Sequence, residues 1–372
     1  MISGPVLMAA GVSLLLAFLI SVALTPLCRA WAVKRQFVDR PQDEGHKEHE
    51  RPTAFGGGIA ITAGILVPMG GMLLAAWLLA DWPAGRFVFL DKWAPSWRPW
   101  LRGVVEKAPV GLSIMAGALA LHIVGLIDDR RPLSARVKLL IQAAVTLAIT
   151  AGVGVRSAEA LGPLPAVLLT TFWIIALTNA FNFMDNMDGL SAGVAVLTAV
   201  VLAVSSMVAG QVFVPCVLML VAGGAAGFLI YNFPPATIFM GDAGSLVLGY
   251  MLAVCAVMTT FYDPEMGTTP FGVLVPVVVF AIPLYDMISV IIHRLRLGVS
   301  IFRGDRRHFS HRLVKRGLSP RTAVLTIYLA TLATSLPAVL LPVHGWVAAL
   351  LIVAQCLAVV TIIAILESCN ES

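Results

Sequence analysis

Long apolar runs separated by short polar connections dominate the pattern along the chain. A helix needs about 20 predominantly apolar residues to cross the hydrocarbon core of a bilayer. Eleven segments approach that length, although the fourth is short and only Gly210 and Gln211 separate the sixth from the seventh, so ten or twelve spans stay open. The segments cover residues 6–27, 57–79, 110–127, 139–153, 163–180, 191–210, 212–231, 245–261, 271–292, 322–341 and 345–366. The pattern predicts an all-α, polytopic membrane bundle, with residues 1–372 forming a single domain.

The cationic residues between these segments predict how the chain is oriented. Connections after odd-numbered segments hold 19 of the 25 Lys and Arg residues: six after the first, four after the third and nine after the ninth. Positively charged connections stay on the cytoplasmic side of a membrane. We therefore predict an N-terminus outside, a C-terminus inside and a basic cytoplasmic loop at residues 294–321.

Acidic, amide and histidine side chains gather at the same ends, although the orientation was assigned from Lys and Arg alone. Ionisable groups at membrane depth are rare and indicate function by default. The residues are Asp128 and Asp129 after the third segment, Asn182, Asp185 and Asp188 after the fifth, Asn232 and Asp242 after the seventh, Asp286 in the ninth, and His308 and His311 in the basic loop. The pattern predicts an active-site cleft on the cytoplasmic face.

Composition supports a membrane protein and excludes other classes. Of the 372 residues, 59% are hydrophobic and only 12% are charged, against roughly a quarter in soluble domains. Such a chain has too few charges to be disordered or to form a nucleic-acid-binding module. Its formal net charge of +5 is explained first by membrane topology.

The acidic cluster indicates phosphoryl transfer. Carboxylates held together at low dielectric repel one another unless cations compensate them. Oxygen ligands without a His/Cys pattern favour Mg²⁺ or Mn²⁺ over Zn²⁺, and Mg²⁺ is often completed by substrate phosphates. Ordinary turns and helix caps are the alternative for Asp242, Asp185 and Asp188. A cation-coupled transporter is the non-enzyme alternative, but it would place acids at the midplane of two related halves, and no halves repeat here.

Seven stretches, in order along most of the chain, resemble one membrane family. They are VDRP (38–41), KEHERPTAFGGG (47–58), GLIDDRRPLSARVKLL (125–140), NAFNFMDNMDGLSAG (179–193), NFPPATIFMGDAGSLVLG (232–249), PLYDMISVIIHR (283–294) and GVSIFRGDRRHFSHRL (298–313). The chain resembles the polyprenyl-phosphate N-acetylhexosamine-1-phosphate transferases, which include GlcNAc-1-phosphate transferases and the phospho-MurNAc-pentapeptide translocase.

The resemblance implies Mg²⁺-dependent transfer of a sugar-1-phosphate from a UDP-N-acetylhexosamine to undecaprenyl phosphate in the bacterial plasma membrane, with release of UMP. It also implies residue roles: Asp242 as metal ligand, Asp128 and Asp129 in catalysis, Asn182, Asp185, Asp188, Asn232 and Phe239 at the nucleotide or sugar, Lys47, Lys138, His308 and His311 at phosphates or sugar, and Asp286 and Asp305 in support. The sequence leaves open whether the chain acts alone or as a homodimer.

The sequence departs from the family pattern in ways that concern the sugar. GlcNAc-type members read H-x-H-H in the basic loop, whereas this chain has Ser310 at the third position. The translocase motif H-H-H-F-E is absent, which favours GlcNAc over a MurNAc-pentapeptide donor. Ala54 and Phe55 stand where Pro and Arg are common.

Direct in-line attack by the acceptor phosphate is the favoured mechanism, and a covalent intermediate on an Asp is the alternative.

Overall fold

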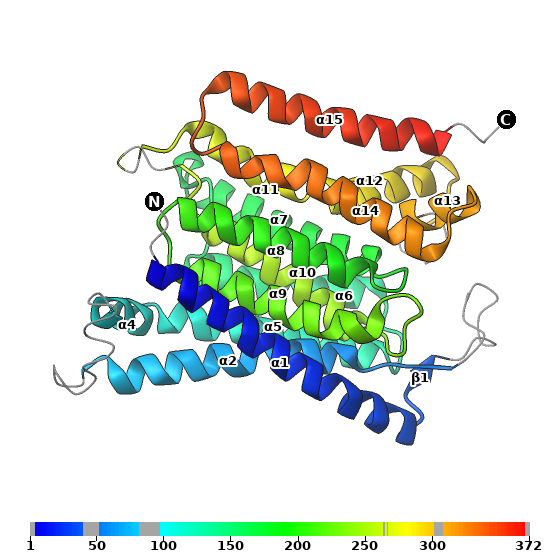
Figure 1. Cartoon of the computed structure of the whole chain (residues 1–372), viewed down its shortest axis with the longest axis horizontal. Helices are drawn as coiled ribbons and strands as arrows, with labels where there is room; N and C mark the ends of the chain where they lie inside the picture. Colours follow the sequence, from blue (N-terminus) through cyan, green and yellow to red (C-terminus); the bar gives the residue numbers. More distant parts are fainter. Residues whose placement is uncertain are drawn as a thin grey trace.

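The computed structural model describes residues 4–39, 52–81, 97–262, 265, 267–300 and 308–368, which are overwhelmingly helical (Figure 1). The helices of the first two thirds are α1 (Gly4–Lys34), α2 (Gly57–Leu79), α4 (Trp97–Glu106), α5 (Ala108–Asp128), α6 (Ala135–Leu147), α7 (Pro163–Met184), α8 (Leu190–Val208), α9 (Phe213–Asn232) and α10 (Asp242–Met258). Those of the last third are α11 (Val275–Val279), α12 (Ala281–Arg296), α13 (Phe309–Lys315), α14 (Pro320–Ser335) and α15 (Trp346–Ser368). The shorter helical turns are η1 (Ala148–Val153), η2 (Glu159–Leu161), η3 (Pro270–Leu274) and η4 (Leu336–Leu340).

Each of the eleven predicted segments coincides with a helix or a helix pair, although not every one has the length and apolar composition of a span. In the described part of the chain, nine helices are long and apolar enough to cross a membrane, and a tenth span is formed if a bent pair counts as one. The difference is α10, which has 17 residues and is short for the hydrocarbon core. Because neighbouring helices enclose α10, its length is not set by the lipid.

The ninth predicted segment is a broken helix. The axis bends by 58° between the part that ends at Val279 and α12. Pro283 lacks the N–H that would bond to the carbonyl of Val279, and proline at such a position kinks a helix. The predicted segment at 271–292 therefore consists of a bent pair of helices and not of one straight helix.

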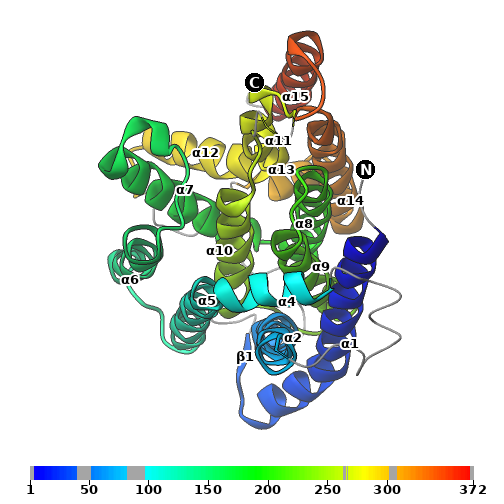
Figure 2. The same ribbon diagram turned by 90° about the vertical axis from the view of Figure 1, so that its left-hand side faces the viewer.

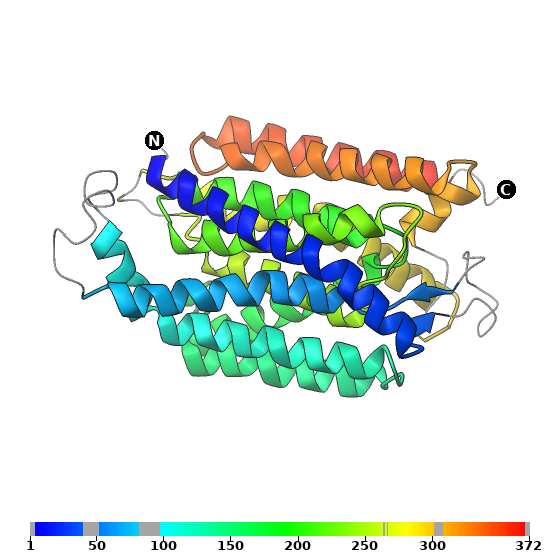
Figure 3. The same ribbon diagram turned by 60° about the horizontal axis from the view of Figure 1, so that its bottom comes forward.

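Helix α10 is the centre of the bundle (Figure 2). It packs against α2, α5, α7, α8 and α9, and its residues from Ala243 to Ala256 are buried. On the periphery, α14 and α15 lie together on one side, and α5 and α6 lie together on the other (Figure 3). The position of α10 matters because its first residue is Asp242.

Two glycines let neighbouring helices approach the first turn of α10. A Cβ on Gly125 of α5 would lie 2.3 Å from the backbone nitrogen of Ala243, and one on Gly58 of α2 would lie 2.5 Å from the nitrogen of Gly244. Both obstacles are backbone, so no side chain can move aside to make room. These contacts fix Asp242 relative to the ends of α2 and α5.

We expect Gly125→Ala to lower both stability and activity. The added methyl group must push α5 away from α10, and overpacking of this kind costs about 1–3 kcal/mol. Thermal unfolding of the detergent-purified protein and its specific activity measure the two effects. Gly11→Ala is the matched control, because a Cβ on this helical glycine meets nothing within 4 Å. Equal melting temperatures for the two variants would contradict the assigned role of Gly125.

A small hairpin ties the first polar connection to the rest of the fold. Strand β1 (Val38–Asp39) pairs antiparallel with β2 (Thr53–Ala54), and Ala54 forms a parallel bridge with Ile238 before α10. The bridge includes a hydrogen bond of 2.8 Å from the Phe239 N–H to the Ala54 carbonyl. The hairpin thereby brings Asp39 and Phe55 to the end of the bundle where α10 begins. Figure 1 shows this hairpin at the same end as α13.

Candidate active site

A cavity of about 970 Å³ opens at the end of the bundle where α10 begins. This volume lies in the range of sites that take a whole small-molecule ligand. The described residues that line it are Val38, Asp39, Phe55, Asp128, Asp129, Pro132, Asn182, Asp185, Asn186, Met187, Asp188, Asn232, Pro234, Pro235, Phe239, Gly241, Asp242, His311, Ser319, Pro320 and Arg321. The predicted acidic residues from three separate connections therefore meet in one cavity.

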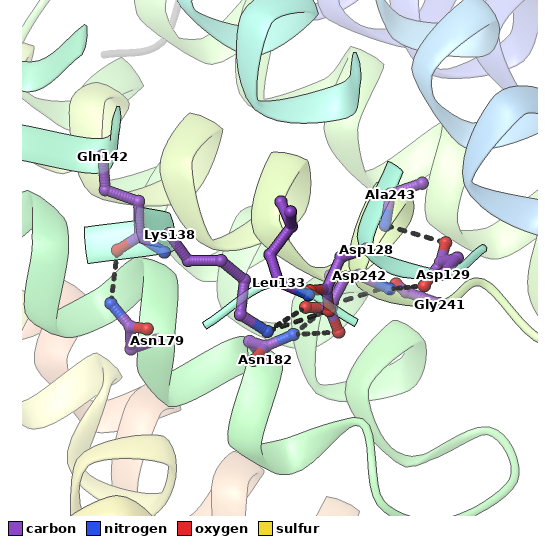
Figure 4. A network of polar contacts seen from close by, with 11 residues as sticks. Asp128, Asp129, Leu133, Lys138, Gln142, Asn179, Asn182, Gly241, Asp242 and Ala243 are labelled. Carbon is purple, nitrogen blue, oxygen red and sulfur yellow. Dashed lines mark hydrogen bonds and ion pairs between the residues drawn. The ribbon is translucent and has the colours of Figure 1, made fainter. Parts of the chain in front are cut away.

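A lysine joins two of the predicted acids (Figure 4). The Lys138 Nζ atom on α6 lies 2.9 Å from Oδ2 of Asp128 and 2.8 Å from Oδ2 of Asp242. The other oxygen of Asp128 accepts a hydrogen bond of 2.7 Å from the N–H of Leu133. Because all three charged side chains are largely shielded from solvent, these ion pairs are stronger than exposed ones. Lys138 thus connects the ends of α5 and α10 electrostatically.

Asparagine 182 orients the second oxygen of Asp242. Its Nδ2 atom donates to Asp242 Oδ1 at 2.8 Å and to Ser245 Oγ at 3.0 Å. One turn earlier on α7, Asn179 donates to Gln142 of α6 at 2.6 Å. The Asn179 bond joins α7 to α6, and the Asn182 bonds join α7 to α10, as Figure 4 shows for Asn179 and Asn182.

Asp129 caps the N-terminus of α10. Its carboxylate accepts hydrogen bonds from the N–H groups of Asp242 at 2.7 Å and Ala243 at 3.3 Å. A carboxylate is favourable here because the first N–H groups of a helix are unsatisfied and the helix dipole is positive. Gly241 permits the approach: it adopts φ 65°, and a Cβ there would lie 2.4 Å from an Asp129 oxygen. Asp129 therefore positions Asp242 through the backbone.

Two acids that lie just beyond the ends of helices, Asp129 and Asp185, have raised pKa values. Burial, followed by the charge of Asp242, raises the pKa of Asp129 to about 7, against the lowering effect of its two backbone donors. Burial and the charges of Asp242, Asp129 and Asp188 raise the pKa of Asp185 well above its ordinary value. Carboxylates in this situation favour a bound cation, because it compensates their mutual repulsion.

The donor set of the cavity suits a hard divalent cation. Asp185 lines the cavity close enough to feel the charge of Asp242, and its carboxylate accepts no hydrogen bond from the described residues. Those residues contain no ready-made group of three His, Cys, Asp or Glu ligands. Mg²⁺ needs only one or two carboxylates when substrate phosphates complete its shell, whereas Zn²⁺ usually takes three or four protein ligands. The residues present therefore fit Mg²⁺.

Two predicted nucleotide-side residues brace the loops around the cavity. Asn232 is only 3% exposed, accepts a hydrogen bond from the Gly189 N–H at 2.9 Å and donates to the Ile238 carbonyl at 2.9 Å. Asp188 accepts one from the Ala236 N–H at 2.8 Å. These bonds join the α7–α8 connection to the α9–α10 connection. Both residues line the cavity, and they also hold its loops in place.

Aromatic side chains form another part of the cavity wall. Phe239 lies in edge contact with Phe55, with ring centroids 6.1 Å apart, and Phe55 packs on Phe37 at 5.5 Å. The position where the family commonly has Arg thus carries a ring that lines the cavity. The departure at residue 55 replaces a charge by apolar surface.

The two predicted histidines lie in different environments. His311 lines the cavity, whereas His308 does not and is 5% exposed. The His308 Nδ1 atom lies 2.9 Å from Asp286 Oδ2, and the other Asp286 oxygen accepts from the Phe309 N–H at 2.8 Å. Asp286 therefore anchors the start of α13, the helix that carries His311. Although three positions separate the two histidines, their rings do not share a helical face, because His308 is the non-helical residue before α13.

Ser310, the departure from the H-x-H-H pattern, is buried and donates a hydrogen bond to Asn186 Oδ1. It thus links α13 to the connection that carries Asp185. Lys47 and Asp305, for which the sequence predicts supporting or phosphate-binding roles, lie outside the described residues.

Sequence reasoning assigned no role to several residues that the structure places at the cavity. Asp39 was present in the VDRP stretch but was not singled out, and Asn186 lies between Asp185 and Asp188. Arg321 was counted only as a topological charge, although it lines the cavity. Its Nε atom donates to the Pro234 carbonyl at 2.7 Å. A contact between residues 87 positions apart leaves no periodic signal in the sequence.

Comparisons with known proteins agree with the predicted family. The family model described as glycosyl transferase family 4 matches residues 111–260. A probable undecaprenyl-phosphate N-acetylglucosaminyl 1-phosphate transferase of Bacillus subtilis is 31% identical over 343 residues, which cover 89% of this chain and 85% of the relative. A decaprenyl-phosphate N-acetylglucosaminephosphotransferase of Mycobacterium leprae is 34% identical over 342 residues, with 85% and 79% covered.

A relative with a different named substrate matches over a similar length. The phospho-N-acetylmuramoyl-pentapeptide-transferase of Desulforudis audaxviator is 32% identical over 351 residues, which cover 87% of this chain and 94% of the relative. Similarity over nearly the whole chain, rather than over one motif, confirms the prediction made from the seven stretches. The chain belongs to glycosyl transferase family 4, the membrane family of polyprenyl-phosphate sugar-1-phosphate transferases.

Proposed function

We propose that this protein transfers GlcNAc-1-phosphate from UDP-GlcNAc to undecaprenyl phosphate, releasing UMP and leaving a diphosphate-linked sugar on the lipid. The observation that carries the proposal is the cavity lined by Asp242 and Asp128, whose carboxylates share an ion pair with Lys138, in a chain whose relatives are named as such transferases. The product would start a cell-envelope polysaccharide. The cavity would face the cytoplasm of the bacterial plasma membrane, where nucleotide sugars are made.

The MurNAc-pentapeptide reaction is the second candidate because a relative with that name is 32% identical. The basic loop favours GlcNAc. It lacks H-H-H-F-E, and it keeps His308 and His311 of the H-x-H-H pattern, with Ser310 in place of the third residue.

Mg²⁺ is the cofactor we propose, held by Asp242 with support from Asp185. When bound, the ion would neutralise charge on the donor diphosphate and on the departing UMP. Mn²⁺ has the same preference for oxygen ligands and is expected to substitute.

Direct attack by the acceptor follows from the chemistry and from the hydrogen bonds of the acids. A phosphomonoester is largely dianionic at pH 7, so it needs little help from a base. One of its oxygens bonds to the β-phosphorus of the donor as the bond from that phosphorus to the bridging oxygen breaks, and UMP takes the electron pair. Both oxygens of Asp128 already accept hydrogen bonds, which stabilise the carboxylate and weaken it as a nucleophile. Asp128 would orient the acceptor, and Lys138 would offset the charge gathered there.

A donor panel tests the proposal. Purified protein, Mg²⁺ and undecaprenyl phosphate are combined with UDP-GlcNAc, UDP-GalNAc, UDP-glucose or UDP-MurNAc-pentapeptide, and released UMP is measured. We expect turnover with UDP-GlcNAc that depends on both lipid and Mg²⁺. UMP release with UDP-MurNAc-pentapeptide alone would establish the second candidate. No UMP from any donor would overturn the proposed reaction.

A further inference from the structure

The charge of the cavity wall poses a problem for the proposed donor. Six carboxylates line the cavity: Asp39, Asp128, Asp129, Asp185, Asp188 and Asp242. Among the described lining residues, Arg321 is the one Lys or Arg side chain. A nucleoside diphosphate brings further negative charge to this wall, so a cationic group that reaches it from within the cavity has a large electrostatic effect.

One of the five N–H donors of the Arg321 guanidinium bonds to the protein and orients the group. Its Nε atom donates to the Pro234 carbonyl at 2.7 Å, in the loop that also contributes Asn232 and Pro235 to the cavity. Its two terminal nitrogens, which carry four of the five N–H groups, have no hydrogen-bond partner or salt bridge among the described residues. A planar fork of this kind matches phosphate oxygens in a way that a flexible ammonium does not.

We infer that Arg321 binds a phosphate of the UDP donor and is a specificity-determining residue for nucleotides that carry a 5′-phosphate. The inference rests on the proposed function, since it names a contact within the same site. Arg321 comes from the first turn of α14, whereas Lys138 comes from α6. Arg321 therefore takes no part in the ion pairs of Lys138. It places a positive charge on the cavity wall, which Lys138 does not line.

Inhibition by three fragments of the donor separates a phosphate contact from a merely structural one. Uridine, UMP and UDP are titrated as inhibitors. The reaction is measured as transfer of label from UDP-GlcNAc to the lipid, so that added UMP does not interfere with the readout. In Arg321→Gln we expect the inhibition constants of UMP and UDP to rise about tenfold to a hundredfold, while that of uridine stays unchanged. We expect KM for UDP-GlcNAc to rise with them and KM for undecaprenyl phosphate to stay constant.

Lys315→Gln is the matched control, since Lys315 is an exposed cation of the same connection that does not line the cavity. It should leave all three inhibition constants unchanged. An unchanged UMP constant in Arg321→Gln would overturn the inference, and so would an equal loss of uridine binding, which would indicate a collapsed loop. Absence of label transfer and of UMP binding in the wild-type protein would instead refute the proposed function.

Discussion

Asp242→Asn will reduce transfer from UDP-GlcNAc by on the order of a thousandfold while the protein stays folded. The amide has nearly the shape of the carboxylate but no charge, so it can neither hold the proposed Mg²⁺ nor pair with Lys138. The fold should survive, because the backbone N–H of residue 242 still bonds to Asp129 and Lys138 still pairs with Asp128.

Steady-state kinetics across a Mg²⁺ titration, together with a melting curve, measure this effect. Excess Mg²⁺ should not restore the rate. Asp81→Asn is the matched control: its carboxylate is 91% exposed beyond the end of α2, away from the cavity. A variant at residue 242 that keeps a tenth of the wild-type rate or more would show that Asp242 is not the metal ligand.

Lys138→Met will lower kcat by on the order of a hundredfold, because it leaves the Asp128 and Asp242 carboxylates without their shared cation. Arg136→Met removes an exposed cation from the same helix and should have little effect. The contrast between these two variants separates a local role from the general loss of positive charge.

A double-mutant cycle tests the bridge itself. If Lys138 acts through Asp128, then Lys138→Met combined with Asp128→Asn will cost less than the product of the two single losses. A coupling energy of at least about 1 kcal/mol is expected for side chains in contact. Additive losses would mean that Lys138 acts independently of Asp128, for example by touching substrate alone.

The sequence was sufficient to predict the helices because apolar length is a local property. All eleven segments are helical, and the shortest of the central helices, α10, has 17 residues and is surrounded by protein. Hydropathy does not predict the break at Phe280, since a proline inside an apolar run bends the helix axis while the run stays apolar.

The acids of the cavity could be placed together from topology, but their contacts could not. Asp129 and Asp242 are 113 positions apart, and their hydrogen bond exists only because Gly125 and Gly241 let the two segments approach. His308 and His311 were separated by a helix start that spacing alone does not reveal. In the sequence, Arg321 does not differ from the other cations that mark the topology. Its role depends on the hydrogen bond to the Pro234 carbonyl, which only the structure shows.

Transfer of a sugar-1-phosphate differs from transfer of a sugar in the bond of the donor that breaks. UDP-GlcNAc labelled with ³²P at the β-phosphate and ³H in the sugar is incubated with the protein, Mg²⁺ and undecaprenyl phosphate, and the lipid and aqueous phases are then separated. We expect both labels to enter the lipid in equal molar amounts while UMP appears in the aqueous phase. Transfer of ³H without ³²P, with UDP released, would contradict it.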